Sequence, residues 1–475
     1  MSVRSRRAFM WQTGVSVASA LCSNRLLAAT SGLRSFSQPR AWLTAGEQHL
    51  QEIQIQPWQS VASTSQSIEI DPSQSFQSIM GFGGAFTDAS CYLFSRMNAA
   101  DRQKLLSELV GPDGLQLSMG RTCIGASDYS RSVYSFDDTQ TPDPELKSFS
   151  TAHDEAYILP TLRAAQQLNP EMFYFSTPWS PPGWMKAGGS MLGGSMRNKY
   201  FAAYAEYFVK FLQAYTTAGV RIGAITSQNE VDTDQDGRMP AALWGQEYEM
   251  GFIKGFLGPA LQKSAIDTKI WILDHNYDLA GRVLDELSDP DVFKYVDGVA
   301  WHGYMGEPAA MTRIHNAFPS KHAYWTEGGP DITDPNYATD SAKWCSAFAR
   351  ILKNWARCIV SWNLVLDENG TPNIGPFRCG GLVTVDSKTG AITRSGQFWA
   401  FAHYSKFIRR GAQVIASKGE LPGVEHAAFR NPDGSYVLAV ANEGNERVVE
   451  CSCSGKALSV KLPPNSVATL TWKEV

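Results

Sequence analysis

At both ends of the chain, apolar and polar residues follow the pattern of β-strands. Residues 52–56 and 67–70 change between polar and apolar at every position, which predicts strands with one exposed face. Near the other end, residues 426–441 hold two apolar runs on either side of an Asn-Pro-Asp-Gly turn, which predicts a β-hairpin. We expect residues 31–78 and 409–475 to form one β-sandwich together.

Between these ends, short apolar runs alternate with longer amphipathic stretches, which is typical of repeated βα units. The stretch 198–218, for example, brings its aromatic residues to one face of a helix. Eight apolar runs follow one another, at 79–87, 117–125, 172–180, 222–230, 269–276, 296–304, 322–329 and 358–366. Eight parallel strands with intervening helices predict a (β/α)8 TIM barrel over residues 79–408.

The competing fold for such a pattern is an open, doubly wound parallel sheet. Many proteins with that fold bind a dinucleotide at a Gly-x-Gly-x-x-Gly turn after the first strand. Here the glycine-rich segment 81–84 has a different spacing and no helix opens directly after it. A dinucleotide site is therefore not expected, and the barrel is the favoured fold.

In a TIM barrel, functional residues lie at the carboxyl ends of the strands. Read in chain order, these ends carry polar and aromatic residues: Asp88, Asp128, Trp179, Asn229, Glu230, Asp274, His275, His302, Tyr304, Glu327, Trp362 and Asn363. The fourth and seventh strands lie on opposite sides of an eight-stranded barrel. We therefore expect Glu230 and Glu327, which close these two strands, to face each other across a bound sugar.

Two facing carboxyl groups are what the cleavage of a glycosidic bond requires. We expect aromatic surroundings to raise the pKa of Glu230, so that it stays protonated and acts as the general acid. Tyr304 and Arg121 are expected to donate hydrogen bonds that keep Glu327 ionised as a nucleophile, and the Asn229 amide to hold a sugar hydroxyl. A separation of about 5 to 5.5 Å would mean retention of anomeric configuration, and a wider one inversion.

Several of these residues also have purely structural interpretations. Asp88 could cap the helix that follows its strand, Trp362 could pack in the core, and His302 could be a hydrogen-bonded wall residue. Both glutamates could serve structure alone. Residues 274–278 contain two aspartates and a histidine, but their spacing matches no standard metal site, so we expect no metal.

The first 30 residues resemble a twin-arginine export signal. An Arg6-Arg7 pair precedes a short apolar run at 13–21, and small residues at 28–29 would allow cleavage, which predicts a periplasmic or extracellular protein. Cys22 is a candidate for lipid anchoring, and its removal would leave seven cysteines, an odd number that argues against a disulfide framework. No later apolar stretch reaches the ~18 residues of a membrane span.

Charge and aromatic content narrow the class of ligand. The formal net charge is −4 and the isoelectric point is near 6.1, so the basic surface that nucleic acid binding needs is not expected. Fourteen tryptophans, some next to proline or glycine, suit a pocket for the flat, amphipathic rings of sugars, although most could be core residues.

Several motifs, in order along the chain, resemble the glucosylceramidases of glycoside hydrolase family 30. They are Gly-Phe-Gly-Gly-Ala-Phe-Thr-Asp at 81–88, Ser-Asp-Tyr-Ser at 127–130, the Pro- and Trp-rich segment 176–186, Gln-Asn-Glu at 228–230, Ser-Trp-Asn-Leu at 361–364, and 401–408. The resemblance covers about 75–475. It implies a TIM barrel joined to a β-sandwich from both chain ends, and a retaining hydrolase of β-glucosidic bonds that needs no metal or organic cofactor.

By motif position, the resemblance implies that Glu230 is the acid/base and Glu327 the nucleophile. It implies glycone binding by Asp88, Trp179, Asn229 and Trp362. The chain departs from the family at 231–232, where a proline is usual, and at Gly303, where an aromatic residue is common. Both departures affect the aglycone side, so β-glucose as the glycone is a firmer expectation than any particular leaving group.

Three functions follow as expectations. The first is hydrolysis of a lipid glucoside, as by a glucosylceramidase. The alternative within the same family is an endo-β-1,6-glucanase, for which Gly303 could supply room for an internal glucosyl unit. The alternative of another class is a carbohydrate-binding protein without catalysis, against which the presence of both glutamates argues.

Overall fold

The computed structural model describes residues 35–60 and 67–475. The predicted export signal and Cys22 lie outside these residues. The centre of the fold is a closed barrel of eight strands, in which every neighbouring pair is parallel. The strands are β5 (Gly81–Ala85), β6 (Met119–Cys123), β7 (Phe173–Thr177), β8 (Ile222–Thr226), β9 (Lys269–Asn276), β10 (Val296–His302), β11 (His322–Glu327) and β12 (Ala356–Ser361). Each overlaps a predicted run, so the TIM barrel is confirmed and the doubly wound sheet is wrong.

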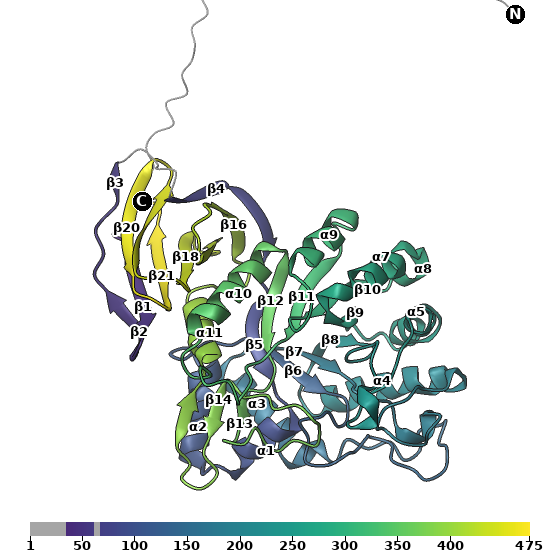
Figure 1. Ribbon diagram of the computed structural model, residues 1–475. Coiled ribbons are helices and arrows are strands. Elements are labelled where there is room, and N and C mark those ends of the chain that lie inside the picture. Colours follow the sequence, from purple (N-terminus) through teal and green to yellow (C-terminus); the bar gives the residue numbers. More distant parts are fainter. Residues whose placement is uncertain (1–34, 61–66) are drawn as a thin grey trace, which may run out of the picture. The chain divides into compact units, whose positions relative to one another are not determined.

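Helices connect the strands and lie on the outer side of the barrel (Figure 1). They are α1 (Asp88–Arg96), α2 (Ala99–Val110), α3 (Ile158–Leu168), α4 (Phe201–Thr217), α5 (Gln246–Phe252), α6 (Gly258–Lys263), α7 (Ala280–Ser288), α8 (Pro290–Phe293), α9 (Ala309–Ala317), α10 (Ser341–Lys353) and α11 (Gly396–Ser405). The predicted aromatic face of α4 is buried, including Tyr204, Tyr207 and Phe211. A small sheet of β13 (Val365–Leu366), β14 (Val383–Val385) and β15 (Ile392–Arg394) follows β12.

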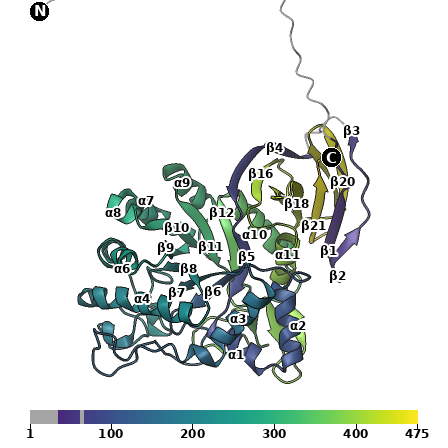
Figure 2. The same ribbon diagram turned by 180° about the vertical axis from the view of Figure 1, so that it is seen from behind.

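The two ends of the chain share one mixed sheet of ten strands. Its order is β2 (Gln48–Ile53), β1 (Arg40–Ala45), β21 (Ser466–Lys473), β18 (Ser435–Asn442), β17 (Val424–Arg430), β16 (Gln413–Lys418), β4 (Ser67–Ser78), β19 (Arg447–Cys453), β20 (Lys456–Leu462) and β3 (Gln59–Ser60). Strands from across the sheet contribute to one apolar core. Figure 2 shows β4 leading from this sheet to β5 of the barrel. The predicted joining of both ends in one β-unit is confirmed.

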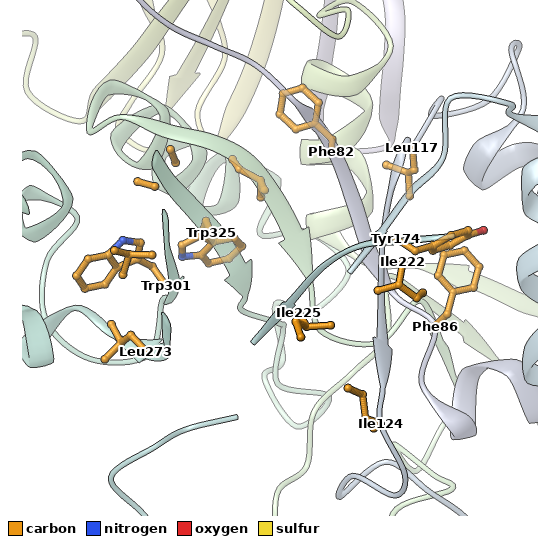
Figure 3. Packing of buried hydrophobic residues seen from close by; sticks show 14 of the residues in the cluster. Phe82, Phe86, Leu117, Ile124, Tyr174, Ile222, Ile225, Leu273, Trp301 and Trp325 are labelled. Atoms are coloured by element: carbon orange, nitrogen blue, oxygen red, sulfur yellow. The ribbon is translucent and has the colours of Figure 1, made fainter. Parts of the chain in front are cut away.

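Two apolar regions hold the barrel together. A large cluster packs the outer faces of the strands against the helices, and Figure 3 shows part of it, including Phe82, Tyr174 and Trp325. A smaller cluster fills the interior, where the rings of Trp271 and Tyr324 stack at 3.9 Å. In residues 35–60 and 67–475, no helix is both long enough and apolar enough to cross a membrane.

Candidate active site

A cavity of about 570 Å³ opens at the carboxyl ends of the barrel strands. Among the residues predicted for the site, its wall includes Trp179, Asn229, Glu230, Tyr304, Glu327 and Trp362. They come from segments that are far apart in sequence and that meet only because the barrel closes. Arg121 and His302 lie directly beneath this wall and are fully buried.

Glu327, the last residue of β11, is held by the two donors that the sequence predicts. Its Oε2 accepts a short hydrogen bond from Nη1 of Arg121, and its Oε1 accepts one from the Tyr304 hydroxyl at 3.1 Å. The side chain is only 7% exposed. A carboxylate with a guanidinium on one oxygen and a phenol on the other is fixed in place, with its charge balanced.

Arg121, in β6, is the central cation of the site. Its Nη2 donates to Asn229 Oδ1 at 2.7 Å and to Asp274 Oδ2 at 2.8 Å. Burial alone would lower the pKa of Arg121, but the negative charges of Asp274 and Glu327 raise it above its usual value. Its guanidinium also lies 4.7 Å from the ring centre of Trp179, which favours a fixed positive charge here.

Asp274 is a buried anion at the centre of the same network. Besides Arg121, its carboxylate is contacted by His302 and accepts hydrogen bonds from the hydroxyls of Thr177, Thr226 and Thr326. Burial would raise the pKa of Asp274, but Arg121 and His302 hold it well below its usual range. Its backbone φ is +44°, and the register of β9 against β10 shifts at this residue. This bulge turns the side chain into the site, a common use of backbone strain.

Glu230 lies beyond the end of β8, with a backbone φ of +51°. Its Oε1 lies 3.3 Å from Nδ1 of His302 and 3.6 Å from Nδ1 of His275, and its Oε2 accepts a hydrogen bond from Gln235 at 2.9 Å. Burial would raise the pKa of Glu230, but the hydrogen bond and charge of His302, with smaller effects of His275 and Arg121, lower it. The prediction of a raised pKa is therefore wrong, because imidazoles rather than aromatic carbon surround the carboxyl group.

His302, the last residue of β10, lies between the two glutamates. Its Nδ1 is 3.3 Å from Glu230 and its Nε2 is 3.8 Å from Glu327 and 3.0 Å from Asp274. Burial would lower the pKa of His302, but these three carboxylates raise it to about 9. Since both glutamates contact one imidazole ring, their carboxyl groups lie less than about 10 Å apart, close enough to act on one bound sugar.

The structure does not bring Asp88 to the cavity. Asp88 is the first residue of α1, whose N-cap is Thr87. Its Oδ1 accepts a hydrogen bond from the backbone N–H of Arg131, and its Oδ2 accepts one from the Tyr157 hydroxyl. Asp88 is not among the residues that line the cavity, so its role in sugar binding stays a prediction. Its carboxylate instead joins α1 to two neighbouring segments.

Two further residues, which the sequence analysis placed at strand ends without a role in sugar binding or catalysis, belong to the site. Asp128 follows β6 and lines the cavity, and its buried Oδ1 has no hydrogen-bond partner among the described residues. Burial, with the charges of Glu327 and Glu230, raises the pKa of Asp128. His275 follows Asp274 and also lines the cavity. The signal for both was their position at strand ends, which does not show where a side chain points.

One group in the part of the chain that the structure describes has the geometry of metal ligands. Glu230, His275 and His302 each offer one ligand atom within 4.8 Å of the other two. Asp274, which the sequence analysis considered as a metal ligand, is instead bound to Arg121.

Comparison with known proteins agrees with this geometry. Residues 79–408 match the Glycosyl hydrolase family 30 TIM-barrel domain, and 411–470 match the Glycosyl hydrolase family 30 beta sandwich domain. An endo-1,6-beta-D-glucanase of Neurospora crassa is 34% identical over 85% of this chain and 87% of its own length. The lysosomal acid glucosylceramidase of Mus musculus is 31% identical over 80% and 78%.

Solved structures are similar over almost the whole chain. SrfJ from Salmonella typhimurium superposes with a TM-score of 0.87 at 26% identity, and covers 92% of this chain and 100% of its own. The endo-beta1,6-glucanase BT3312 gives a TM-score of 0.82 at 28% identity, with the same coverage.

Proposed function

The chain belongs to glycosyl hydrolase family 30, a family of retaining O-glycosyl hydrolases, and from this premise we propose that it cleaves β-1,6-glucosidic bonds within glucan chains. The observation that carries the hydrolytic part of the proposal is the convergence of Glu230 and Glu327 on one cavity, with the His302 ring between them. The sequence interpretation placed a lipid glucoside first. The comparisons favour its alternative, because the relatives that are 34% and 33% identical are endo-1,6-beta-D-glucanases.

We assign the nucleophile to Glu327. Arg121 and Tyr304 each donate a hydrogen bond to one of its oxygens, which keeps the carboxylate ionised and aimed at the cavity. It attacks the anomeric carbon, a bond forms between that carbon and Glu327, and the bond to the leaving sugar oxygen breaks.

Glu230 supplies the proton that the leaving oxygen needs. At neutral pH a proton is held on His302, whose Nδ1 faces Oε1 of Glu230 at 3.3 Å. This proton passes to Glu230 and then to the leaving sugar, while Nε2 of His302 keeps its contact with Asp274. In the second half of the reaction, Glu230 takes a proton from water, which attacks the anomeric carbon and releases Glu327.

Other residues that line the cavity suit a glucose ring. Trp179 and Trp362 stack at 5.0 Å and present aromatic surface. The Asn229 amide oxygen accepts from Arg121, which orients its NH2 group for a sugar hydroxyl. The unpartnered Oδ1 of Asp128 is a further position that can bind a sugar hydroxyl.

The rim of the cavity fits a continuing chain of sugars. Tyr304, Met305 and Phe377 line the cavity and are 45%, 59% and 43% exposed, so they offer flat apolar surface for further rings. The expectation that Gly303 supplies room is not supported, because a Cβ atom there would lie 2.6 Å from the buried Trp325 side chain and Gly303 is not among the residues that line the cavity.

The test is product analysis on a linear β-1,6-glucan and on glucosylceramide, side by side with the same enzyme. We expect β-1,6-linked oligosaccharides of several lengths from the glucan at early times, and little glucose from the lipid. Rapid release of glucose from glucosylceramide with an intact glucan would overturn the substrate assignment. If neither substrate is cleaved while glucan still binds, the non-catalytic binding protein is the correct interpretation.

A further inference from the structure

The general acid Glu230 and two histidines beside it form a cluster of three side chains that the hydrolytic mechanism does not fully use. Oε1 of Glu230 lies 3.3 Å from Nδ1 of His302 and 3.6 Å from Nδ1 of His275. Zinc binds nitrogen and oxygen ligands at about 2.0–2.2 Å in tetrahedral geometry, which separates neighbouring ligand atoms by about 3.4 Å. The two observed separations match that spacing.

The opposite nitrogen of each histidine is bound to a carboxylate. Nε2 of His275 lies 2.5 Å from Oδ1 of Asp232, and Nε2 of His302 lies 3.0 Å from Oδ1 of Asp274. Histidines that bind metals in proteins are almost always held in this way, because the carboxylate fixes the ring and leaves the other nitrogen for the metal. Both histidines therefore direct Nδ1 toward the same carboxyl group, and a proton on Nδ1 of His302 leaves when that nitrogen ligates an ion.

The cluster is largely buried but can be reached from the cavity. The His275 side chain is only 9% exposed, and its Nδ1 has no hydrogen-bond partner among the residues that the structure describes. Such an orphaned buried atom is costly unless it gains a partner. Glu230 and His275 line the cavity, so an ion can enter by the path that the substrate uses.

We propose that Glu230, His275 and His302 bind one divalent transition-metal ion of the zinc class, and that the bound ion reversibly inhibits hydrolysis. Two imidazoles and one carboxylate select Zn²⁺, Cu²⁺ or Ni²⁺ over Mg²⁺ and Ca²⁺, which prefer oxygen ligands. Inhibition follows because a carboxylate that ligates a metal cannot donate a proton to the leaving sugar. This second part rests on the proposed role of Glu230, whereas binding of the ion does not.

Binding is measured by titration calorimetry with Zn²⁺ on chelator-treated protein in the absence of substrate. We expect one ion per chain, displaced by a chelator, and no binding of Mg²⁺. His275→Gln removes a ligand and abolishes binding. Asp232→Asn removes only the carboxylate behind the ring and weakens affinity about 10- to 100-fold. His315→Gln, in α9 where the histidine stacks on Trp355, is the matched control and leaves binding unchanged.

Inhibition is measured in parallel by hydrolysis of the β-1,6-glucan at increasing Zn²⁺. We expect inhibition with the same affinity as binding, and full recovery on addition of chelator. Unchanged Zn²⁺ affinity in both His275→Gln and Asp232→Asn, or no binding by the wild type, would overturn the metal site. Binding that leaves hydrolysis intact would instead overturn the role of Glu230 and keep the site.

Discussion

Two adjacent layers of the barrel interior are built from the same strands but differ completely in chemistry. β6 contributes Met119 to the apolar layer and, two residues later, Arg121 to the polar layer. β8 contributes Ala224 to the first and Thr226 to the second. Residues two positions apart lie on the same face of a strand, so a single pleat repeat separates the two layers.

The difference shows what each layer requires. The apolar layer needs its volume filled, and Trp271 and Tyr324 do this by stacking. In the polar layer each buried charge needs a specific partner, and Asp274 has one in Arg121 and another in His302. Changes in the first layer should therefore affect stability, and changes at the rim of the second should affect catalysis.

The largest effect is expected for Glu327→Gln, which removes the nucleophile but keeps the size of the side chain. We expect kcat for an activated aryl β-glucoside to fall by about 10⁴-fold or more, because no covalent intermediate can form. Glu206→Gln, on the exposed face of α4, is the matched control and should keep full activity. Wild-type activity in Glu327→Gln would remove this residue from the mechanism.

Glu230→Gln should separate substrates by their leaving groups. For the natural glucan we expect a loss of about 10²- to 10⁴-fold, because the departing sugar oxygen must be protonated. For an aryl glucoside with a strongly acidic phenol, formation of the intermediate should be far less affected. Steady-state and burst kinetics on both substrates measure the difference, and an equal loss of this step on both would contradict the assignment.

In the apolar layer, Trp271→Ala should act on stability instead. Trp271 is 1% exposed and stacks on Tyr324. We expect a loss of about 3–5 kcal/mol in the free energy of unfolding, measured by urea denaturation, because the cavity left behind cannot collapse fully. The fraction that stays folded should keep a wild-type KM. A large change in KM without a loss of stability would mean that the two layers are not separable.

Two buried histidines differ in pKa because their surroundings differ. Carboxylates raise the pKa of His302, whereas burial lowers the pKa of His403 in α11 to about 3. The two ring nitrogens of His403 form hydrogen bonds with the hydroxyls of Thr469 and Thr44, in β21 and β1. The unfolded state therefore binds the proton more tightly, so this contribution to stability is complete above pH 6.5 and is lost as the pH falls toward 3.

The measurement is the free energy of unfolding as a function of pH. Between pH 6.5 and 3, protonation linked to His403 should lower the free energy of unfolding of the wild type by about 1.4 kcal/mol for each pH unit. The slope should be smaller in His403→Gln, which cannot be protonated. Identical slopes in the two proteins would show that other groups cause the acid sensitivity.

The fold could be predicted from the sequence because each barrel strand is a short apolar run. The segments between the runs are long enough to form the helical crossover that two neighbouring parallel strands need. Glu230 and Glu327 could be found because they follow the fourth strand and end the seventh, although these two strands are three positions apart in the barrel and not, as we expected, directly opposite. Asp88 ends a strand in the same way, but its two oxygens bind Arg131 and Tyr157, and no local pattern reports such distant partners. The lowered pKa of Glu230 could not be predicted either, because His275 and His302 contact it from other strands.

The most direct test of the account is to trap the covalent intermediate. A 2-deoxy-2-fluoro-β-glucoside with a good leaving group forms the glycosyl-enzyme quickly but slows its hydrolysis, because the fluorine destabilises the oxocarbenium-like transition state. Mass spectrometry of the digested protein should then find one fluoroglucosyl group, on the peptide that contains Glu327. A label on any other residue, or turnover that yields the inverted anomer first, would contradict the assignment of Glu327 and Glu230 as nucleophile and acid.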